Sequence, residues 1–361
     1  MNAWTEAYRG RRVLVTGHTG FKGAWLSLWL HHLGARVTGY SLPPPTDRPT
    51  VFTSTGLAHL VTHVEGDVRD LGDLQRVWRE TDPEIVFHLA AQPIVWESYR
   101  APLDTVTTNV VGTVNVLEAA RVAAAPTTLV LITSDKCYEN LEIERGYHET
   151  DQLGGADVYS GSKAAAELLI SSYRRSFFGD AVPIAVASTR AGNVIGGGDW
   201  SPNRIVPDAI RALSQGQTIE VRNPCAVRPW QHVLEPLSGY LQLGAAILAN
   251  PTRRLCSAWN FGPTLENSRT VRDLVERIVG CWGSGAWRDA PSSGAPHEAT
   301  LLRLDIAKAH RELGWAPRWN FDHAVDRTVA WYKAHEHGAS VRDECFDQIA
   351  EYETSAITTH V

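Results

Sequence analysis

The stretch RRVLVTGHTGFKG, residues 11–23, decides the fold of this chain. Its first six residues are typical of a short buried strand, and they stop at a turn that contains Gly17, Gly20 and Gly23. Apolar residues then recur at helical spacing up to Leu33, before Gly34. Glycines at this spacing allow a tight turn, let the backbone approach a pyrophosphate and aim a helix N-terminus at its charge. The stretch therefore predicts a dinucleotide site in preference to a simple turn.

The segments that follow alternate between strand and helix patterns. Apolar or β-branched runs predict strands at residues 35–41, 61–70, 84–91, 129–133 and 184–190. Helical patterns stand at residues 71–80 and 109–125 and in the run that follows Tyr159. This alternation, led by the glycine turn, predicts an α/β fold with a Rossmann-type doubly wound parallel sheet.

A glycine-rich loop at residues 191–200 ends this regular alternation. Beyond it the pattern is mixed, with a helix expected at residues 205–213 and a strand at 218–221. We therefore expect an NAD-binding Rossmann domain at residues 1–193, to which later segments return. Residues 194–361 are expected to form mainly a smaller, mixed α/β substrate lobe.

The ends of the predicted strands supply the expected contacts to the dinucleotide. Ser41 ends the second strand, where an acid usually holds the adenine ribose in NAD-binding proteins, and no Arg follows it to bind a 2′-phosphate. NAD is the cofactor that we expect. Asp67 is a natural acceptor for the adenine amino group, although it could simply shape the turn before the next helix. His88 is expected to be a core histidine.

Two groups of reactive side chains complete the candidate site. Ser134, Asp135 and Lys136 follow a buried strand directly, at the edge where open α/β sheets bind ligands. In the segment YSGSK, Tyr159 and Lys163 are four residues apart at the start of a helical run, so they share one helix face. An ammonium beside a phenol favours the phenolate and would lower the pKa of Tyr159. Either group alone is ambiguous, and together they indicate an active site.

Composition excludes several classes of protein. The 361 residues carry a net charge of −6 with scattered Lys and Arg, so nucleic acid is not an expected partner. The five cysteines include no CxxC pair, which argues against a zinc site and for reduced thiols in the cytoplasm. No apolar run approaches the ~18 residues of a membrane helix, and the first residues lack a signal-peptide pattern.

Six motifs, TGHTGFKG, HLAAQP, TSDKCYEN, GNVIGGGDW, RPWQHV and LGWAP, resemble those of the extended short-chain dehydrogenase/reductases that act on nucleotide sugars. Within that group they are most similar to the CDP-glucose 4,6-dehydratases, and the match covers nearly the whole chain. The resemblance implies tightly held NAD, CDP-glucose as substrate and a role in bacterial deoxysugar synthesis. It also implies a homodimer, for which the helices at 109–125 and after Tyr159 could form the interface. The dTDP-glucose enzymes carry Thr-Asp-Glu where this chain has Ser134, Asp135 and Lys136.

The resemblance implies a role for each candidate residue. Tyr159 removes the 4-hydroxyl proton while NAD accepts the C4 hydride, with Lys163 and Ser134 holding the phenolate. Lys136, as a neutral amine, takes the C5 proton, which burial or a cation such as Lys163 would favour. Asp135 protonates the departing 6-hydroxyl, and hydride returns to C6. The expected cofactor contacts are Gly17, Thr19, Gly20, Phe21, Lys22, Gly23, Ser41, Asp67, Val68, Leu89, Ala90, Ala91, Asn109, Tyr159 and Lys163. The expected substrate contacts are Gln92, Asn193, Arg204, Arg228, Asn260 and Glu298.

Two other functions use much of the same pattern. A nucleotide-sugar 4-epimerase would share the glycine turn, Tyr159 and Lys163, but it needs no acid and base to eliminate water. A non-catalytic dinucleotide-binding protein would share the fold, but it has no need of an intact Tyr159, Lys163 and Ser134. For Arg228 itself, phosphate binding and a position along an apolar surface are equally consistent with the sequence.

Overall fold

The computed structural model describes residues 4–123, 125–179, 183–252, 254–264, 267–291 and 301–356. A seven-stranded sheet forms its centre, in the order β11-β6-β5-β4-β1-β2-β3, and every neighbouring pair of strands is parallel. The strands are β1 (Arg12–Thr16), β2 (Arg36–Ser41), β3 (Thr62–Glu65), β4 (Ile85–His88), β5 (Thr127–Ile132), β6 (Ile184–Arg190) and β11 (Ala258–Asn260). The predicted Rossmann-type sheet is confirmed.

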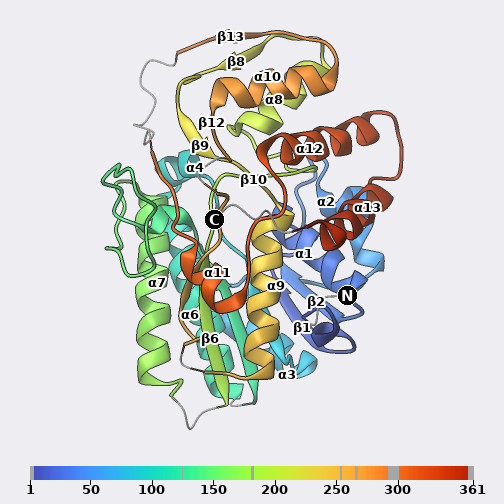
Figure 1. The fold of residues 1–361 in the computed structure, drawn as a ribbon. Coiled ribbons are helices and arrows are strands. Elements are labelled where there is room, and N and C mark those ends of the chain that lie inside the picture. The colour runs from blue at the N-terminus through green and yellow to red at the C-terminus, as the bar shows by residue number, and fades with distance from the viewer. Residues whose placement is uncertain are drawn as a thin grey trace.

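Helices cover both faces of this sheet because its strands are apolar on both sides. On β1, Val13 and Val15 contact one hydrophobic cluster and Leu14 contacts another. The first cluster includes α1 (Phe21–His32), α9 (Leu234–Ala249), α12 (Phe321–Glu336) and α13 (Val341–Thr354). The second includes α3 (Leu71–Thr81), α6 (Gly112–Ala123) and α7 (Val158–Ser176). The sheet is therefore the middle of three layers (Figure 1).

Shorter elements connect these layers. They are η1 (Glu6–Tyr8), α2 (Val51–Thr55), η2 (Leu57–His59), α4 (Val95–Arg100), α5 (Pro102–Val106), the π-helical η3 (Thr107–Val111) and η4 (Asp135–Cys137). The helix expected at residues 109–125 thus begins with a π-helical turn that continues into α6.

The second lobe consists of helices and two-stranded ribbons that lie above the sheet in Figure 1. Its elements are β7 (Val194–Ile195), α8 (Ile205–Ser214), β8 (Ile219–Val221), β9 (Val227–Pro229), β10 (Gln231–His232), β12 (Ser268–Thr270), α10 (Val271–Trp282) and β13 (Trp287–Asp289). Between β10 and β12 the chain returns to the sheet, since α9 contacts β5 and β11 pairs with β6. After β13, α11 (Ala307–Leu313) contacts α9 and β11. A cut at residue 193 therefore leaves one strand of the large sheet in the second half of the chain.

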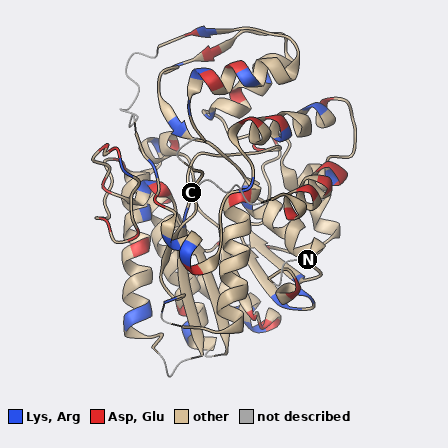
Figure 2. Ribbon diagram, viewed as in Figure 1, with Lys and Arg blue, Asp and Glu red and all other residues tan. Residues whose placement is uncertain are grey.

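Charges of both signs are interspersed over the two lobes (Figure 2). Across the ranges described, no helix is both long and apolar enough to cross a membrane.

Candidate active site

The carboxyl ends of five sheet strands open into one cavity of about 960 Å³ between the sheet and the second lobe. Gly17 follows β1, Ser41 ends β2, Leu89 follows β4, Thr133 follows β5 and Ala191 follows β6. All five line the cavity because parallel strands end at the same edge of a sheet. The cavity therefore lies where the sequence places the dinucleotide and the reactive side chains.

The glycine turn has the geometry that its sequence predicts. Gly17 has a φ of +77°, and a Cβ on it would lie 2.6 Å from the backbone nitrogen of Ala90. A Cβ on Gly23 would lie 2.1 Å from the carbonyl oxygen of Gly17, so only glycine lets α1 approach the turn. The N-cap of α1, Gly20, provides no side-chain hydrogen bond to the first turn of the helix. The first N–H groups of α1 thus keep the capacity to bind an anion.

Three predicted cofactor residues in this part of the cavity already have hydrogen-bond partners. The hydroxyl groups of Thr19 and Ser41 are 2.8 Å apart and share a hydrogen bond. The Asp67 carboxylate accepts hydrogen bonds from the side chain and the backbone N–H of Arg69. These hydrogen bonds hold the pKa of Asp67 below its usual value. Asp67 is therefore an ionised acceptor whose position is fixed by its neighbour.

The strand-exit residues are gathered at the other end of the cavity. Ser134 ends the extended backbone after β5, and its hydroxyl donates to Asp135 Oδ1 at 3.0 Å and accepts from the backbone N–H of Lys136 at 3.2 Å. The amide of Asn193, from the loop after β6, lies 3.5 Å from Asp135 Oδ2. Asp135 is 4% exposed, whereas Lys136 lines the cavity with an exposed side chain. The burial suggested for Lys136 is not found.

Tyr159 and Lys163 lie on the first two turns of α7, and both are buried. Burial raises the pKa of Tyr159 to about 12, against a hydrogen bond with Ser134 that lowers it. Burial also lowers the pKa of Lys163 to about 8. The expectation that Lys163 lowers the pKa of Tyr159 is therefore wrong for this structure, because desolvation disfavours the charged form of each group. The spacing of four residues does place both in the cavity with Ser134.

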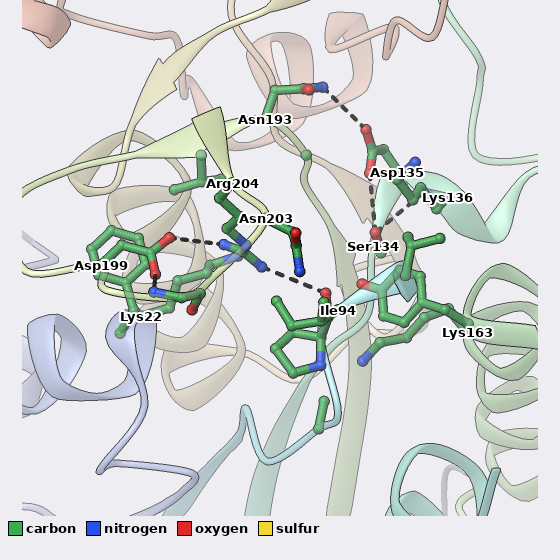
Figure 3. A pocket seen from close by; sticks show the side chains of 18 of the residues that line it. Lys22, Ile94, Ser134, Asp135, Lys136, Lys163, Asn193, Asp199, Asn203 and Arg204 are labelled. Carbon is green, nitrogen blue, oxygen red and sulfur yellow. Dashed lines mark hydrogen bonds and ion pairs between the residues drawn. The ribbon is translucent and has the colours of Figure 1, made fainter. Parts of the chain in front are cut away.

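A cluster of cations faces this end of the cavity. Three of the five lysines in the chain, Lys22, Lys136 and Lys163, line it. Burial and the neighbouring charges of Lys163 and Arg204 lower the pKa of Lys22 to about 7. Arg204, at the start of α8, forms an ion pair with Asp199 at 3.0 Å and approaches the carbonyl oxygen of Pro93 at 3.5 Å (Figure 3). Such a cluster favours an anionic ligand.

Comparison with known proteins assigns the family. The sequence model described as GDP-mannose 4,6 dehydratase matches residues 14–328. This chain belongs to the GDP-mannose 4,6 dehydratase family. It is also 46% identical to the CDP-glucose 4,6-dehydratase of Salmonella typhimurium over 349 residues, 96% of this chain and 97% of the relative. The predicted resemblance to nucleotide-sugar 4,6-dehydratases is confirmed.

Solved structures share the fold of this dehydratase family member. A dTDP-glucose 4,6-dehydratase from Streptomyces venezuelae, described with NAD bound, superimposes with a TM-score of 0.77 at 24% identity, over 91% of this chain and 98% of that one. A UDP-glucose 4-epimerase from Brucella ovis superimposes with a TM-score of 0.74 at 22% identity, over 89% and 98%. Dehydratases and epimerases thus have the same fold, and the site residues must distinguish them.

Most predicted site residues line the cavity of this family member. They are Gly17, Thr19, Gly20, Phe21, Lys22, Gly23, Ser41, Asp67, Val68, Leu89, Ala90, Ala91, Ser134, Asp135, Lys136, Tyr159, Lys163, Asn193, Arg204 and Arg228. His88 is a core histidine as expected, with ring nitrogens bonded to the hydroxyls of Thr16 and Thr113. Burial lowers the pKa of His88 to about 3, so it is neutral.

Three predicted contacts do not line the cavity, and a fourth, Glu298, lies outside the described residues. The Asn109 amide binds both backbone groups of Gln92, and the Gln92 amide binds Thr105 and the N–H of Ile94. Asn260 is fully buried and donates to the carbonyl oxygens of Tyr147 and Asp305. The polar atoms of these three side chains bind other groups of the protein, and their assignment to ligand contact stays a prediction.

Two further groups of residues line the cavity and were not predicted from the sequence. Residues 93–96, at the start of α4, line it from the sheet side, and Arg222 lines it from the second lobe. The guanidinium of Arg222 lies over the ring of Trp96, 5.8 Å from its centroid. An Arg and an aromatic residue separated by more than a hundred positions leave no local pattern, so only the fold brings them together.

Proposed function

We propose that this chain converts CDP-D-glucose to CDP-4-dehydro-6-deoxy-D-glucose and water. The observation that carries the proposal is that Asp135 and Lys136 line the same cavity as Ser134, Tyr159 and Lys163. A 4-epimerase requires only Ser134, Tyr159 and Lys163. Asp135 and Lys136 add the acid and the amine that the loss of water from C5 and C6 needs. The similarity to the CDP-glucose 4,6-dehydratase of Salmonella typhimurium supports cytidine as the nucleoside of the substrate.

The cavity fits NAD, which supplies a hydride acceptor and donor when it is bound. The glycine turn and the N-terminus of α1 would hold the pyrophosphate, since Gly17 and Gly23 let the turn and the helix pack closely and bring the first N–H groups of α1 to the cavity. Ser41, Thr19 and Asp67 would hold the adenosine. Tyr159 and Lys163 lie near the end of β5, where the nicotinamide ribose would reach them.

Proton removal at the 4-hydroxyl falls to Tyr159. As a phenolate it accepts that proton, and the Ser134 hydroxyl favours the phenolate when it turns from Asp135 to donate to Tyr159. Because burial holds the pKa of Tyr159 at about 12 and that of Lys163 at about 8, the active form requires both charges together in the cavity. The ammonium of Lys163 and the phenolate of Tyr159 then compensate each other.

Elimination falls to Asp135 and Lys136. A ketone at C4 acidifies the C5 proton, which the amine of Lys136 can accept in its neutral form. Asp135 in its protonated form donates to the departing 6-hydroxyl. Asn193 beside Asp135 Oδ2 and Ser134 beside Oδ1 orient that carboxyl group. Arg204 and Arg228 would bind the substrate pyrophosphate from the second lobe.

Incubation of the protein and NAD with CDP-, dTDP-, UDP- and GDP-glucose tests this proposal. We expect a 4-keto-6-deoxy product from CDP-glucose at the highest kcat/KM. A 4-epimer as product would support the epimerase instead. No turnover of any of the four would refute catalysis on glucose nucleotides.

We further infer that the enzyme is a cytoplasmic homodimer in which α6 and α7 form the interface. The two helices lie side by side (Figure 1). On α7, Val158, Gly161, Ala165 and Leu168 follow one another at helical spacing on the outer face, and Leu168 is 57% exposed. The described cysteines are all free, which supports a reducing compartment.

Sedimentation analysis of Leu168→Glu tests the interface. A buried charge without a partner would separate the subunits, so the variant should be a monomer. Leu141→Glu is the matched control, because Leu141 is 68% exposed on a loop outside the helix pair. A monomeric wild type, or a dimeric Leu168→Glu, would rule out this interface.

A further inference from the structure

A buried ion pair lies beneath the strand exits without lining the cavity. Glu167 on α7 and Arg190 at the end of β6 are 2.8 Å apart, and each side chain is 3% exposed. Burial acts to raise the pKa of Glu167, but Arg190 and three hydrogen bonds hold it below its usual value. The carboxylate is therefore ionised inside the protein, where an ion pair is costly to place and even more costly to break.

The two members of the pair hold opposite ends of the segment that carries Ser134, Asp135 and Lys136. Thr133, directly before the segment, donates from its hydroxyl to Glu167 Oε1 at 2.5 Å. Tyr138, directly after η4, accepts a hydrogen bond from Arg190 at 2.6 Å. The Arg190 guanidinium also lies over the Tyr138 ring, 4.8 Å from its centroid. One ion pair thus fixes both ends of the segment.

Glu167 also faces the catalytic lysine. Tyr159, Lys163 and Glu167 succeed one another at intervals of four residues on α7, so they share a face of the helix. The described groups that act on Lys163 from other elements are Cys137 on η4, His88 on β4 and Lys22 on α1. Burial raises the pKa of Cys137 and lowers that of His88 to about 3, so both are neutral near pH 7. Glu167 is the ionised acid among these neighbours.

We propose that Glu167 and Arg190 are positioning residues for the dehydration. Their ion pair holds the Ser134–Lys136 segment at both ends, and the Glu167 carboxylate keeps Lys163 charged opposite Tyr159. The proposal rests on the function proposed above for its effect on turnover. Its electrostatic half concerns Lys163 alone and can be measured without turnover.

The experiment compares Glu167→Gln, Thr133→Val and Glu235→Gln with the wild type. Thr133→Val removes the hydroxyl contact to Glu167 and leaves the ion pair in place. Glu235→Gln is the matched control, since Glu235 is also a buried acid, 1% exposed, that accepts hydrogen bonds and lies outside the cavity lining. The chain contains five lysines, so lysine labelled with ¹³C at Cε gives five side-chain signals whose shifts follow protonation. Lys163→Arg assigns the relevant signal.

We expect Lys163 in Glu167→Gln to lose its proton at lower pH than in the wild type, and kcat to fall by about 10- to 100-fold with KM nearly unchanged. Thr133→Val should lower kcat and leave the Lys163 titration as in the wild type. Glu235→Gln should change neither. An unchanged Lys163 titration in Glu167→Gln would overturn the electrostatic half, and wild-type kcat in Thr133→Val would overturn the positioning half, even if Glu167→Gln did not fold. Failure of the wild type to turn over CDP-glucose would refute the proposed function and leave the titration result intact.

Discussion

Replacing Gly192 by alanine should impair catalysis by moving Asp135 rather than by removing it. Gly192 follows β6 and lines the cavity beside Asn193. A Cβ on Gly192 would lie 1.8 Å from Asp135 Oδ2 and 2.1 Å from its Cγ. Since both close atoms belong to a side chain, the backbone can stay in place while the carboxyl group turns away.

The size of the effect follows from that displacement. A carbon atom and a non-bonded neighbour pack at about 3.5 Å, so the carboxyl group must move by roughly 1.7 Å, the difference between 3.5 and 1.8 Å. A misplacement of ~1 Å can cost ~10²-fold in rate, so kcat should fall at least about 10²-fold, which is ~2.7 kcal/mol of activation free energy. The free energy of unfolding should fall by about 1 kcal/mol, which is the cost of an off-rotamer side chain in the folded state.

Steady-state kinetics with CDP-glucose and urea denaturation measure the two effects separately. Gly280→Ala on α10 is the matched control, because a Cβ there has no atom within 4 Å. It should keep wild-type kcat and gain about 0.5–1 kcal/mol of stability. Wild-type kcat in a folded Gly192→Ala would refute the reasoning, because the carboxyl group could then act from a displaced position.

Four other predictions can be checked independently. Asp135→Asn should accumulate a 4-ketoglucose nucleotide in rapid-quench experiments, with a loss of ~10²–10⁴ in overall rate, whereas Tyr159→Phe should form none; the reverse pattern would exchange the two roles. Arg228→Ala should raise KM, and a fall in kcat alone would place Arg228 in the chemistry. CDP-glucose deuterated at C4 should give a product that mass spectrometry shows to be labelled at C6. Deuterium in the solvent would exclude the return of the same hydride from C4 to C6. Burial raises the pKa of Glu235 from 4.5 to about 7, so the folded chain keeps a proton that the unfolded chain loses in this interval. The free energy of unfolding should therefore fall by about 3 kcal/mol over that range in wild type and not in Glu235→Gln, as urea titrations at pH 4.5 and 7.5 would detect.

The sequence predicted those parts of the fold that have a local cause. Gly17 has a φ of +77°, and Gly23 is required by its close approach to the backbone of Gly17, so both have a cause within the first turn that their spacing in the sequence predicts. Ser134 to Lys136 follow a buried strand, and the edge at which parallel strands end is a property of the fold class. The position of these residues in one cavity followed from that rule.

Other residues could not be assigned because their partners are distant in the sequence. Asn109 and Gln92 bind each other across seventeen positions, and Asn260 binds Tyr138, Tyr147 and Asp305 from the last strand of the sheet. A polar residue beside a cofactor motif looks the same in the sequence whether its side chain points into the cavity or holds a loop in place. Only the hydrogen bonds distinguish the two.

The electrostatics of α7 show the same limit on a smaller scale. The spacing of Tyr159 and Lys163 gives their common face, but it does not report how much water reaches them. In the structure both are buried, and desolvation is the largest influence on each pKa. The next residue on that face, Glu167, stands among helix-forming residues, and nothing in the sequence marks it as buried. Its charge depends on its ion pair with Arg190, at the end of β6. A sequence motif thus places the reacting groups, whereas the protonation states that they need come from buried neighbours that the fold brings together.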